Sequence, residues 1–203
     1  MLIEQPPKIF RMLIPGGEFR IPSREERRVY LTFDDGPIPE VTPWILDVLD
    51  SYDIKATFFM VGDNVRKYPE IYEEVRRRGH RVGNHTMHHI QGAHTTTRGY
   101  LRDVEEANRL IGSDLFRPPH GWLRPRQSKL LSRRYRIIMY DLVTRDYSKR
   151  INAAQVVENV KRYTRPGSII VFHDSLKSRD KLETALRESI EWLRGEGYSF
   201  ELL

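Results

Sequence analysis

Residues 29–39 have the sequence VYLTFDDGPIP. The apolar and β-branched run from Val29 to Phe33 predicts a buried strand. It ends in two adjacent carboxylates, Asp34 and Asp35, followed by Gly-Pro. Asp-Gly-Pro is ordinary turn chemistry, but neighbouring carboxylates repel each other and no Lys or Arg stands directly beside them. The stretch therefore indicates either a simple turn or a site whose positive partners come from elsewhere.

The alternation of short apolar runs with helix-like segments extends along the chain. Seven strands are predicted at 28–35, 55–62, 80–85, 115–119, 136–143, 167–174 and 198–203. Helices are predicted at 42–52, 69–78, 97–111, 125–133, 153–163 and 181–194. This order favours an α/β fold with a parallel sheet, either a compact (β/α) barrel or a doubly wound sheet. Residues 1–28 have no steady period and are interpreted as an N-terminal arm, before one domain over 29–203.

Composition limits the class of protein. The 203 residues suit one domain, and 39% hydrophobic with 31% charged residues is typical of globular chains. The absence of cysteine excludes disulfides, thiolate metal sites and cysteine nucleophiles. No apolar run is long enough for a signal peptide or a membrane span, so a cytoplasmic location is the default expectation. The 34 basic and 28 acidic residues give a net charge of +6, yet no nucleic-acid motif accompanies it, so nucleic-acid binding is not expected.

Polar residues of unusual type follow five of the predicted strands. They are Asp34 and Asp35, His85, Arg117, Asp146, and His173 with Asp174. In parallel α/β folds, the carboxyl ends of the strands meet at one face, which carries the active site. The sequence therefore predicts one site built from these side chains.

Histidines of the segment NHTMHH, residues 84–89, predict a metal site. If a helical turn begins near His85, then His85 and His89 lie on one face at i and i+4, and His88 at i+3 is a competing ligand. A catalytic zinc usually takes three protein ligands, often two His and a carboxylate. Asp34 or Asp35 can supply that carboxylate, which leaves the other to accept a proton from a water molecule.

His173 ends an almost wholly apolar run and is a candidate general acid. Asp146 or Asp174 could orient its ring, and Asp146 is preferred because adjacent strand residues point to opposite faces. Arg117, in FRPPHG, could pair with the aspartate that remains free.

The segments TFDDGP, HTMHH, RPPHG, DLVTRDY and VFHD resemble, in order and approximate spacing, the five motifs of the NodB-homology polysaccharide deacetylases, carbohydrate esterase family 4. The resemblance covers about residues 29–203. It implies a distorted (β/α) barrel of about seven strands and a divalent metal, usually zinc, with cobalt or nickel as alternatives. The implied roles are listed here: Asp34 as base, Asp35, His85 and His89 as metal ligands, Arg117 as tether of the base, His173 as acid, and Asp146 as the residue that tunes the acid.

Some positions depart from the family pattern. Tyr147 stands where the family commonly has Trp, Val171 where Leu is frequent, and His120 where Tyr is frequent. The resemblance implies that these residues shape the acyl pocket and the contacts with the sugar. Trp122 is a candidate for stacking on a sugar ring, or else a partly buried core aromatic.

The predicted function is metal-dependent removal of N-acetyl groups from a peptidoglycan- or chitin-like glycan or a sugar conjugate. The alternatives are hydrolysis of a non-sugar amide or imide, hydrolysis of O-acetyl groups as on acetylxylan, and a glycan-binding module without activity. The predicted partner is an acetylated carbohydrate. Within the N-terminal arm, the sequence KIFRMLI mixes charged and apolar residues, which is compatible with contact to an anionic membrane. Export from the cell is a further alternative to the cytoplasmic location.

Overall fold

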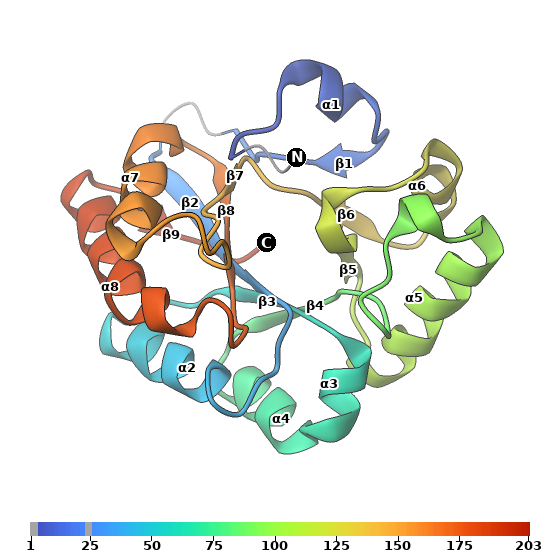
Figure 1. Cartoon of the computed structure of the whole chain (residues 1–203), viewed down its shortest axis with the longest axis horizontal. Helices are drawn as coiled ribbons and strands as arrows, with labels where there is room; N and C mark the ends of the chain where they lie inside the picture. Colours follow the sequence, from blue (N-terminus) through green and yellow to red (C-terminus); the bar gives the residue numbers. More distant parts are fainter. Residues whose placement is uncertain (1–3, 23–25) are drawn as a thin grey trace.

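The computed structural model describes residues 4–22 and 26–203, and its strands form a ring surrounded by helices (Figure 1). The predicted arm, residues 1–28, thus falls partly outside the described residues. Nine strands make one parallel sheet in the order β1-β6-β5-β4-β3-β2-β8-β7, with β9 paired to β2. The strands are β1 (Gly17–Glu18), β2 (Arg28–Asp34), β3 (Thr57–Met60), β4 (Arg81–Asn84), β5 (Leu115–Phe116), β6 (Arg136–Ile138), β7 (Leu142–Val143), β8 (Ser168–His173) and β9 (Ser199–Phe200).

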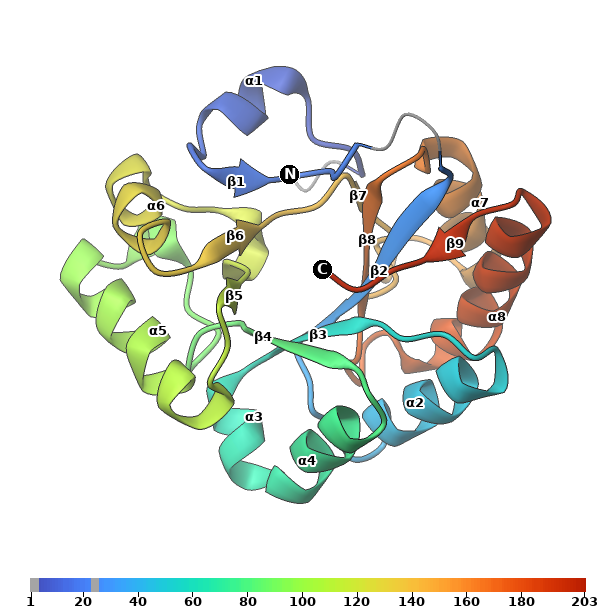
Figure 2. The ribbon, with the colours of Figure 1, turned by 180° about the vertical axis from the view of Figure 1, so that it is seen from behind.

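The helices lie outside the strands, which confirms the predicted distorted α/β barrel (Figure 2). They are α1 (Lys8–Met12), α2 (Thr42–Ser51), α3 (Gly62–Lys67), α4 (Pro69–Arg77), α5 (Thr97–Ile111), α6 (Pro125–Leu131), α7 (Ala153–Tyr163) and α8 (Arg179–Gly195), with short 3-10 segments at Gly92–His94 and Pro119–Gly121. None of the helices in the described parts of the chain combines the length and hydropathy needed to cross a membrane.

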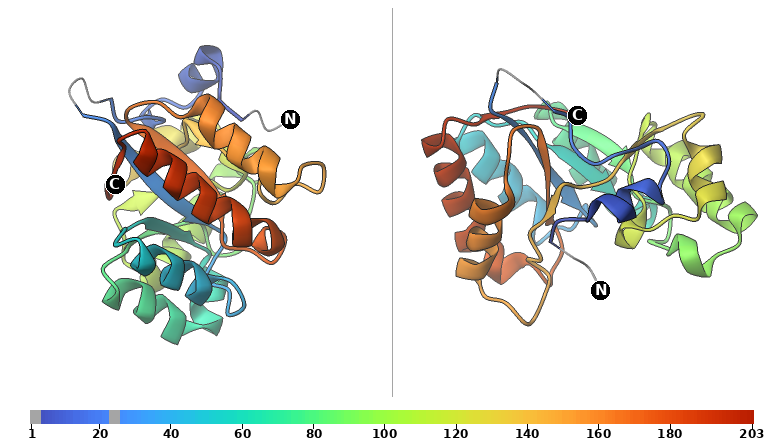
Figure 3. Two further views of the ribbon diagram at one scale, coloured as in Figure 1. Left: turned by 90° about the vertical axis from the view of Figure 1, so that its left-hand side faces the viewer. Right: turned by 90° about the horizontal axis from the view of Figure 1, so that it is seen from above.

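Alternation along β2 divides its side chains between two faces. Val29, Leu31 and Phe33 point outward into the large core that α2, α7 and α8 cover. Figure 3 shows α7 and α8 side by side along the outside of β2. Tyr30 points the other way, into the ring of strands, where it meets Leu203 at the C-terminus. Because the side-chain period of a strand is two, Asp34 continues on this inner face.

The predicted strand at 136–143 is two strands in the structure. Its first half, β6, pairs with β5 and β1, whereas its second half, β7, pairs with β8. Between them, the Met139 N–H donates to Glu18 O at 2.8 Å and the Asp141 N–H donates to Ile169 O at 3.0 Å. The run therefore changes partners between residues 139 and 141, and it spans the two sides of the barrel.

The N-terminal segment contacts the strands of the barrel at two places. β1 pairs with β6, and Arg20 forms an antiparallel bridge with Ser168 of β8. The segment thus fills the opening where β6 and β8 diverge. Ile14 and Phe19 are buried in a core cluster shared with α5 and α6. The division of the chain into domains at residue 29 remains a prediction.

Candidate active site

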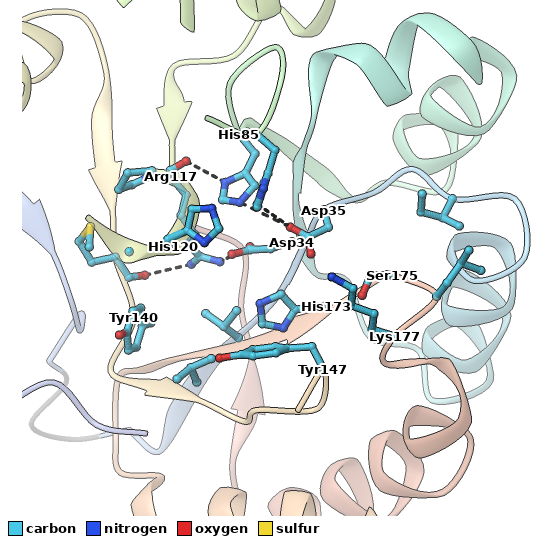
Figure 4. A pocket seen from close by; sticks show the side chains of 18 residues that line it. Asp34, Asp35, His85, Arg117, His120, Tyr140, Tyr147, His173, Ser175 and Lys177 are labelled. Atoms are coloured by element: carbon cyan, nitrogen blue, oxygen red, sulfur yellow. Dashed lines mark hydrogen bonds and ion pairs between the residues drawn. The ribbon is translucent and has the colours of Figure 1, made fainter. Parts of the chain in front are cut away.

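A cavity of about 350 Å³ opens at the carboxyl ends of the strands (Figure 4). Side chains that end β2 and β8, or directly follow β4 and β5, converge on it. Asp146 and Asp174, which were predicted at the same site, are not among its lining residues. Its lining comprises Asp34, Asp35, Ile38, His85, His89, Arg117, Pro118, His120, Gly121, Met139, Tyr140, Val143, Tyr147, Val171, His173, Ser175, Leu176 and Lys177.

Asp34 and Arg117 form a buried ion pair on the inner face of the barrel. Arg117 Nη1 lies 2.6 Å from Asp34 Oδ1 and 2.7 Å from Thr32 Oγ1. The same guanidinium donates to the carbonyl oxygens of Ile138 and Met139 at 3.3 and 3.0 Å. Four acceptors therefore fix the guanidinium, and it fixes one oxygen of Asp34 while the carboxylate still borders the cavity.

Asp35 turns away from Asp34 toward two histidines. Its φ of 89° breaks the alternation of the strand, and Asn64 Nδ2 donates to its carbonyl oxygen at 2.8 Å. Asp35 Oδ1 lies 3.1 Å from His89 Nε2 and 3.7 Å from His85 Nε2. One ligand atom from each of these three residues lies within 4.8 Å of the others. Two imidazoles and one carboxylate in this arrangement match the donor set of a divalent zinc site.

The surroundings of His85 suit a metal ligand. Its Nδ1 lies 2.8 Å from the carbonyl oxygen of Arg117, so Nδ1 carries the proton and Nε2 keeps a free lone pair. Burial lowers the pKa of His85 to about 4, so the ring is neutral at neutral pH. The fit of Asp35, His85 and His89 to a divalent cation therefore rests on the protonation state as well as on the distances.

Charge around Asp35 favours its ionised form. Burial raises the pKa of Asp35, but the hydrogen bond from His89 and the positive charge of His173 outweigh burial. Together they hold the pKa of this carboxyl well below its usual range. Asp35 therefore offers a carboxylate oxygen throughout the neutral pH range.

The segment that carries the histidines is a loop, so the helical turn that would place His85 and His89 on one face is not formed. Thr86 and His89 have φ values of 66° and 54°, which no helix contains. Asp103 of α5 holds the loop, because its Oδ1 accepts from the N–H groups of Met87 and His88 at 2.8 and 3.2 Å. His88 Nδ1 lies 2.6 Å from the other oxygen of Asp103, so the competing ligand turns away from the cluster.

His173 and Asp146 form a second pair on the opposite wall. His173 Nδ1 lies 2.8 Å from Asp146 Oδ1, and the His173 N–H donates to Asp146 Oδ2 at 2.7 Å. Burial opposes protonation of the ring, but the carboxylate of Asp146 outweighs burial and raises the pKa of His173 to about 9. Asp174 faces elsewhere and accepts hydrogen bonds from the Gly36 N–H and the Thr42 hydroxyl at 2.9 and 2.7 Å.

The predicted substrate-binding residues divide into two groups. His120, Tyr147 and Val171 line the cavity; the ring of Tyr147 stands edge-on to His173 with centroids 4.7 Å apart, and that of His120 lies 4.8 Å from His89. Trp122 is not among the lining residues, and its ring packs on Phe10 of α1 at 5.4 Å. Trp122 therefore corresponds to the core alternative that the sequence left open.

The structure adds residues that sequence reasoning missed. Tyr140, Ser175, Leu176 and Lys177 line the cavity, and Lys181 Nζ donates to the carbonyl oxygen of Asp146 at 2.7 Å. Ser175 to Lys177 directly follow VFHD, so their place after a strand end was a usable signal. Tyr140 gave no signal, because it lies within the run that was predicted as one continuous strand.

Known proteins share this fold and this sequence pattern. The polysaccharide deacetylase family matches residues 22–138. A chitooligosaccharide deacetylase of Rhizobium leguminosarum bv. trifolii is 32% identical over 197 residues, which cover 88% of this chain and 91% of that protein. A solved structure of a peptidoglycan N-acetylglucosamine deacetylase is 32% identical with a TM-score of 0.86, and the match covers 98% of this chain and 95% of that one.

A third comparison concerns a protein that is described as lacking activity. The structure of a pseudoenzyme of the CE4 family from Bacillus anthracis is 26% identical with a TM-score of 0.83, and the match covers 93% of this chain and 68% of that one. Family membership alone therefore does not establish turnover. The family match extends over more than half of the sequence, and the chain belongs to the polysaccharide deacetylase family.

Proposed function

We propose that this protein is a metal-dependent hydrolase that removes N-acetyl groups from an amino-sugar glycan of the peptidoglycan or chitin type, or from a sugar conjugate. One observation carries the proposal: a possible three-ligand metal cluster, an Asp34–Arg117 pair and a His173–Asp146 pair border the same cavity. A glycan-binding module would need neither a proton acceptor nor a proton donor on opposite walls. The names of the relatives supply the class of substrate.

Asp35, His85 and His89 would hold the divalent cation, with zinc expected and cobalt or nickel as alternatives. When bound, such a cation lowers the pKa of a water molecule and polarises the acyl oxygen. The neutral ring of His85 and the charged Asp35 are ready to bind without a prior change of protonation.

Asp34 is assigned the role of general base. One of its oxygens is held by Arg117 at 2.6 Å, and the carboxylate borders the cavity. It accepts a proton as the water oxygen forms a bond with the acyl carbon. The backbone N–H near His120 is assigned to the oxyanion that develops on the acyl oxygen.

His173 is assigned the role of general acid. Its pKa of about 9 keeps it protonated at neutral pH, and Asp146 holds Nδ1 so that Nε2 is the nitrogen able to donate. It gives a proton to the nitrogen as the carbon–nitrogen bond breaks, and the products are an amine and acetate. Tyr147 and Val171 wall the same side of the cavity, and they are assigned to the acyl group.

Acetate release from acetylated substrates, with ring opening as the readout for a cyclic imide, tests this proposal directly. Chitooligosaccharides, peptidoglycan fragments, acetylxylan and a small cyclic imide are incubated with chelator-treated protein, before and after addition of zinc or cobalt. Metal-dependent acetate from an N-acetylated glycan is the expected result. Release from acetylxylan alone would make the protein an O-esterase, and hydrolysis of the imide alone would overturn the assignment to sugars. No turnover of any substrate by metal-loaded protein would also contradict the proposal.

A further inference from the structure

Three large apolar side chains are exposed on and beside α1. Ile9 is 73% exposed, Met12 79% and Leu13 47%. They stand at i, i+3 and i+4, which places them on one face of the helical turn. Phe10 and Ile14 point inward instead, and Ile14 is only 1% exposed. The three side chains, here termed the α1 surface, are therefore the outer face of a segment whose inner face is anchored in the barrel.

A basic cavity adjoins the α1 surface. Its volume is about 360 Å³, and its lining includes Pro6 and Pro7 just before α1, together with Arg11, Arg20 and Arg165. Asp141 accepts hydrogen bonds from Arg11 at 2.7 Å and from Arg165 at 2.6 and 2.8 Å. Asp141 is buried and pairs with two of the three guanidiniums that line the cavity, so the lining keeps an excess of positive charge.

We propose that the α1 surface and the basic cavity dock this protein on a membrane that contains anionic lipids. Apolar side chains with adjacent cationic groups are the combination that binds a bilayer interface, because the side chains enter the acyl boundary while the cations meet lipid phosphates. Arg20 is the best placed of the three cations, because among the described residues its guanidinium donates to the carbonyl oxygen of Pro166 and not to an acid.

Charge decides between a membrane and a second copy of the chain. An apolar protein partner would need only the α1 surface and not the basic cavity. A second copy of the chain carries the same net charge of +6 and would place like charges opposite each other. An anionic lipid surface satisfies both features. One backbone contact joins the N-terminal segment to a wall of the proposed active site: the Val143 N–H donates to Glu4 O at 2.9 Å, and Val143 lines that cavity.

Vesicle sedimentation tests the proposal on the full chain. The probes are vesicles of phosphatidylcholine alone and vesicles of equal parts phosphatidylcholine and phosphatidylglycerol. The unmodified protein should sediment with the anionic vesicles and remain free with the neutral ones. The double variant Ile9→Ser, Met12→Ser should lose about tenfold in binding, since each side chain contributes several buried carbons. Arg20→Gln should weaken binding and flatten its dependence on salt.

A matched control separates the α1 surface from general stickiness. Leu110 and Leu202 are 42% and 40% exposed on other parts of the chain. Leu110→Ser with Leu202→Ser should bind as the unmodified protein does. Equal binding to both kinds of vesicle, no binding to either, or an equal loss in this control would overturn the proposal. A dimer seen in sedimentation velocity that dissociates in the Ile9→Ser, Met12→Ser variant would assign the surface to a second copy instead.

Discussion

Asp34 and Asp35 are neighbours in the chain, but their side chains meet different partners. Strand alternation directs Asp34 inward to Arg117, and the positive φ of Asp35 turns its carboxylate toward His85 and His89. Each carboxylate thus lies against a separate set of positive or proton-donating groups. These partners come from the ends of β4 and β5 and from the loop after β4. They relieve the repulsion between the two neighbouring carboxylates.

The two aspartates are expected to respond differently to substitution. Asp34→Asn keeps the shape and a contact to Arg117 but removes the proton acceptor, so kcat should fall by about 10²–10⁴-fold. Bound zinc, measured by atomic absorption after dialysis, should be unchanged. In His89→Ala, zinc and activity should be lost together. Near-normal kcat in Asp34→Asn would show that the base is another group.

The pair His173–Asp146 sets an expectation for pH dependence. The proton-donating form of His173 is present below its pKa of about 9 and is lost as the pH rises through that value. A divalent cation in the same cavity repels the imidazolium, so the alkaline fall in kcat/KM should lie at or below pH 9. Asp146→Asn removes the carboxylate that raises this pKa, and the fall should move to lower pH.

A pH profile of both proteins checks this expectation. Lys149→Ala changes an exposed residue near the site and should leave the profile in place. An alkaline limb that stays at the same pH in Asp146→Asn would separate that limb from His173.

For individual residues, the sequence predicted which side chains share the cavity, but it did not predict the backbone conformation that brings the histidines there. Positions after strand ends were sufficient to gather Asp34, Asp35, Arg117 and His173 in one cavity. The spacing of His85 and His89 suggested a helix, whereas the structure uses a loop with two positive φ values. Such a loop depends on Asp103, which lies on α5, 16 residues after Met87, and no local pattern indicates that contact.

Among the elements, α5 is the support of the histidine loop. Asp103 accepts from two consecutive backbone N–H groups and contacts the ring of His88. Asp103→Ala removes these acceptors, and the loop should hold His89 less firmly. Metal affinity should fall about tenfold or more, as for other residues that support metal ligands.

Competition with a fluorescent zinc chelator measures this affinity. Glu106→Ala, at an exposed position of the same helix, is the matched control and should bind zinc as the unmodified protein does. Equal affinities in Asp103→Ala and Glu106→Ala would mean that the loop holds its shape without α5.

The elements that sequence patterns located well are those with long, local signals. Helices α5 and α7 have the predicted bounds, and α7 begins with Asn152 accepting from the Gln155 N–H at 2.9 Å. The helix α3 was missed because it has six residues and begins at a glycine. The division of β6 from β7 was missed because a change of strand partner leaves no trace in hydropathy.

At the scale of the whole molecule, the N-terminal segment closes the barrel. It pairs with β6 through β1 and bridges to β8 at Arg20, and Arg11 reaches Asp141 at 2.7 Å. The composition of residues 1–28 predicted no regular structure, because its contacts are with strands more than a hundred residues away. The segment is held by tertiary contacts and not by local propensity.

Two residues of this segment test whether it belongs to the folding unit, because they stand two positions apart and differ in burial. Ile14 is 1% exposed within the cluster that includes Phe19 and Leu131, whereas Met12 is 79% exposed. If the segment is part of the folding unit, Ile14→Ala leaves a cavity in that cluster and should lower the free energy of unfolding by about 2–5 kcal/mol. Met12→Ala, the matched control, should change it by less than about 0.5 kcal/mol.

Urea denaturation followed by tryptophan fluorescence measures both variants. Trp122 packs on Phe10 in this segment, so the signal also reports on the local contact. A single transition that shifts to lower urea in Ile14→Ala would place the segment within the cooperative unit. If Ile14→Ala unfolds at the same urea concentration as Met12→Ala, the segment is an arm that rests on a barrel stable without it.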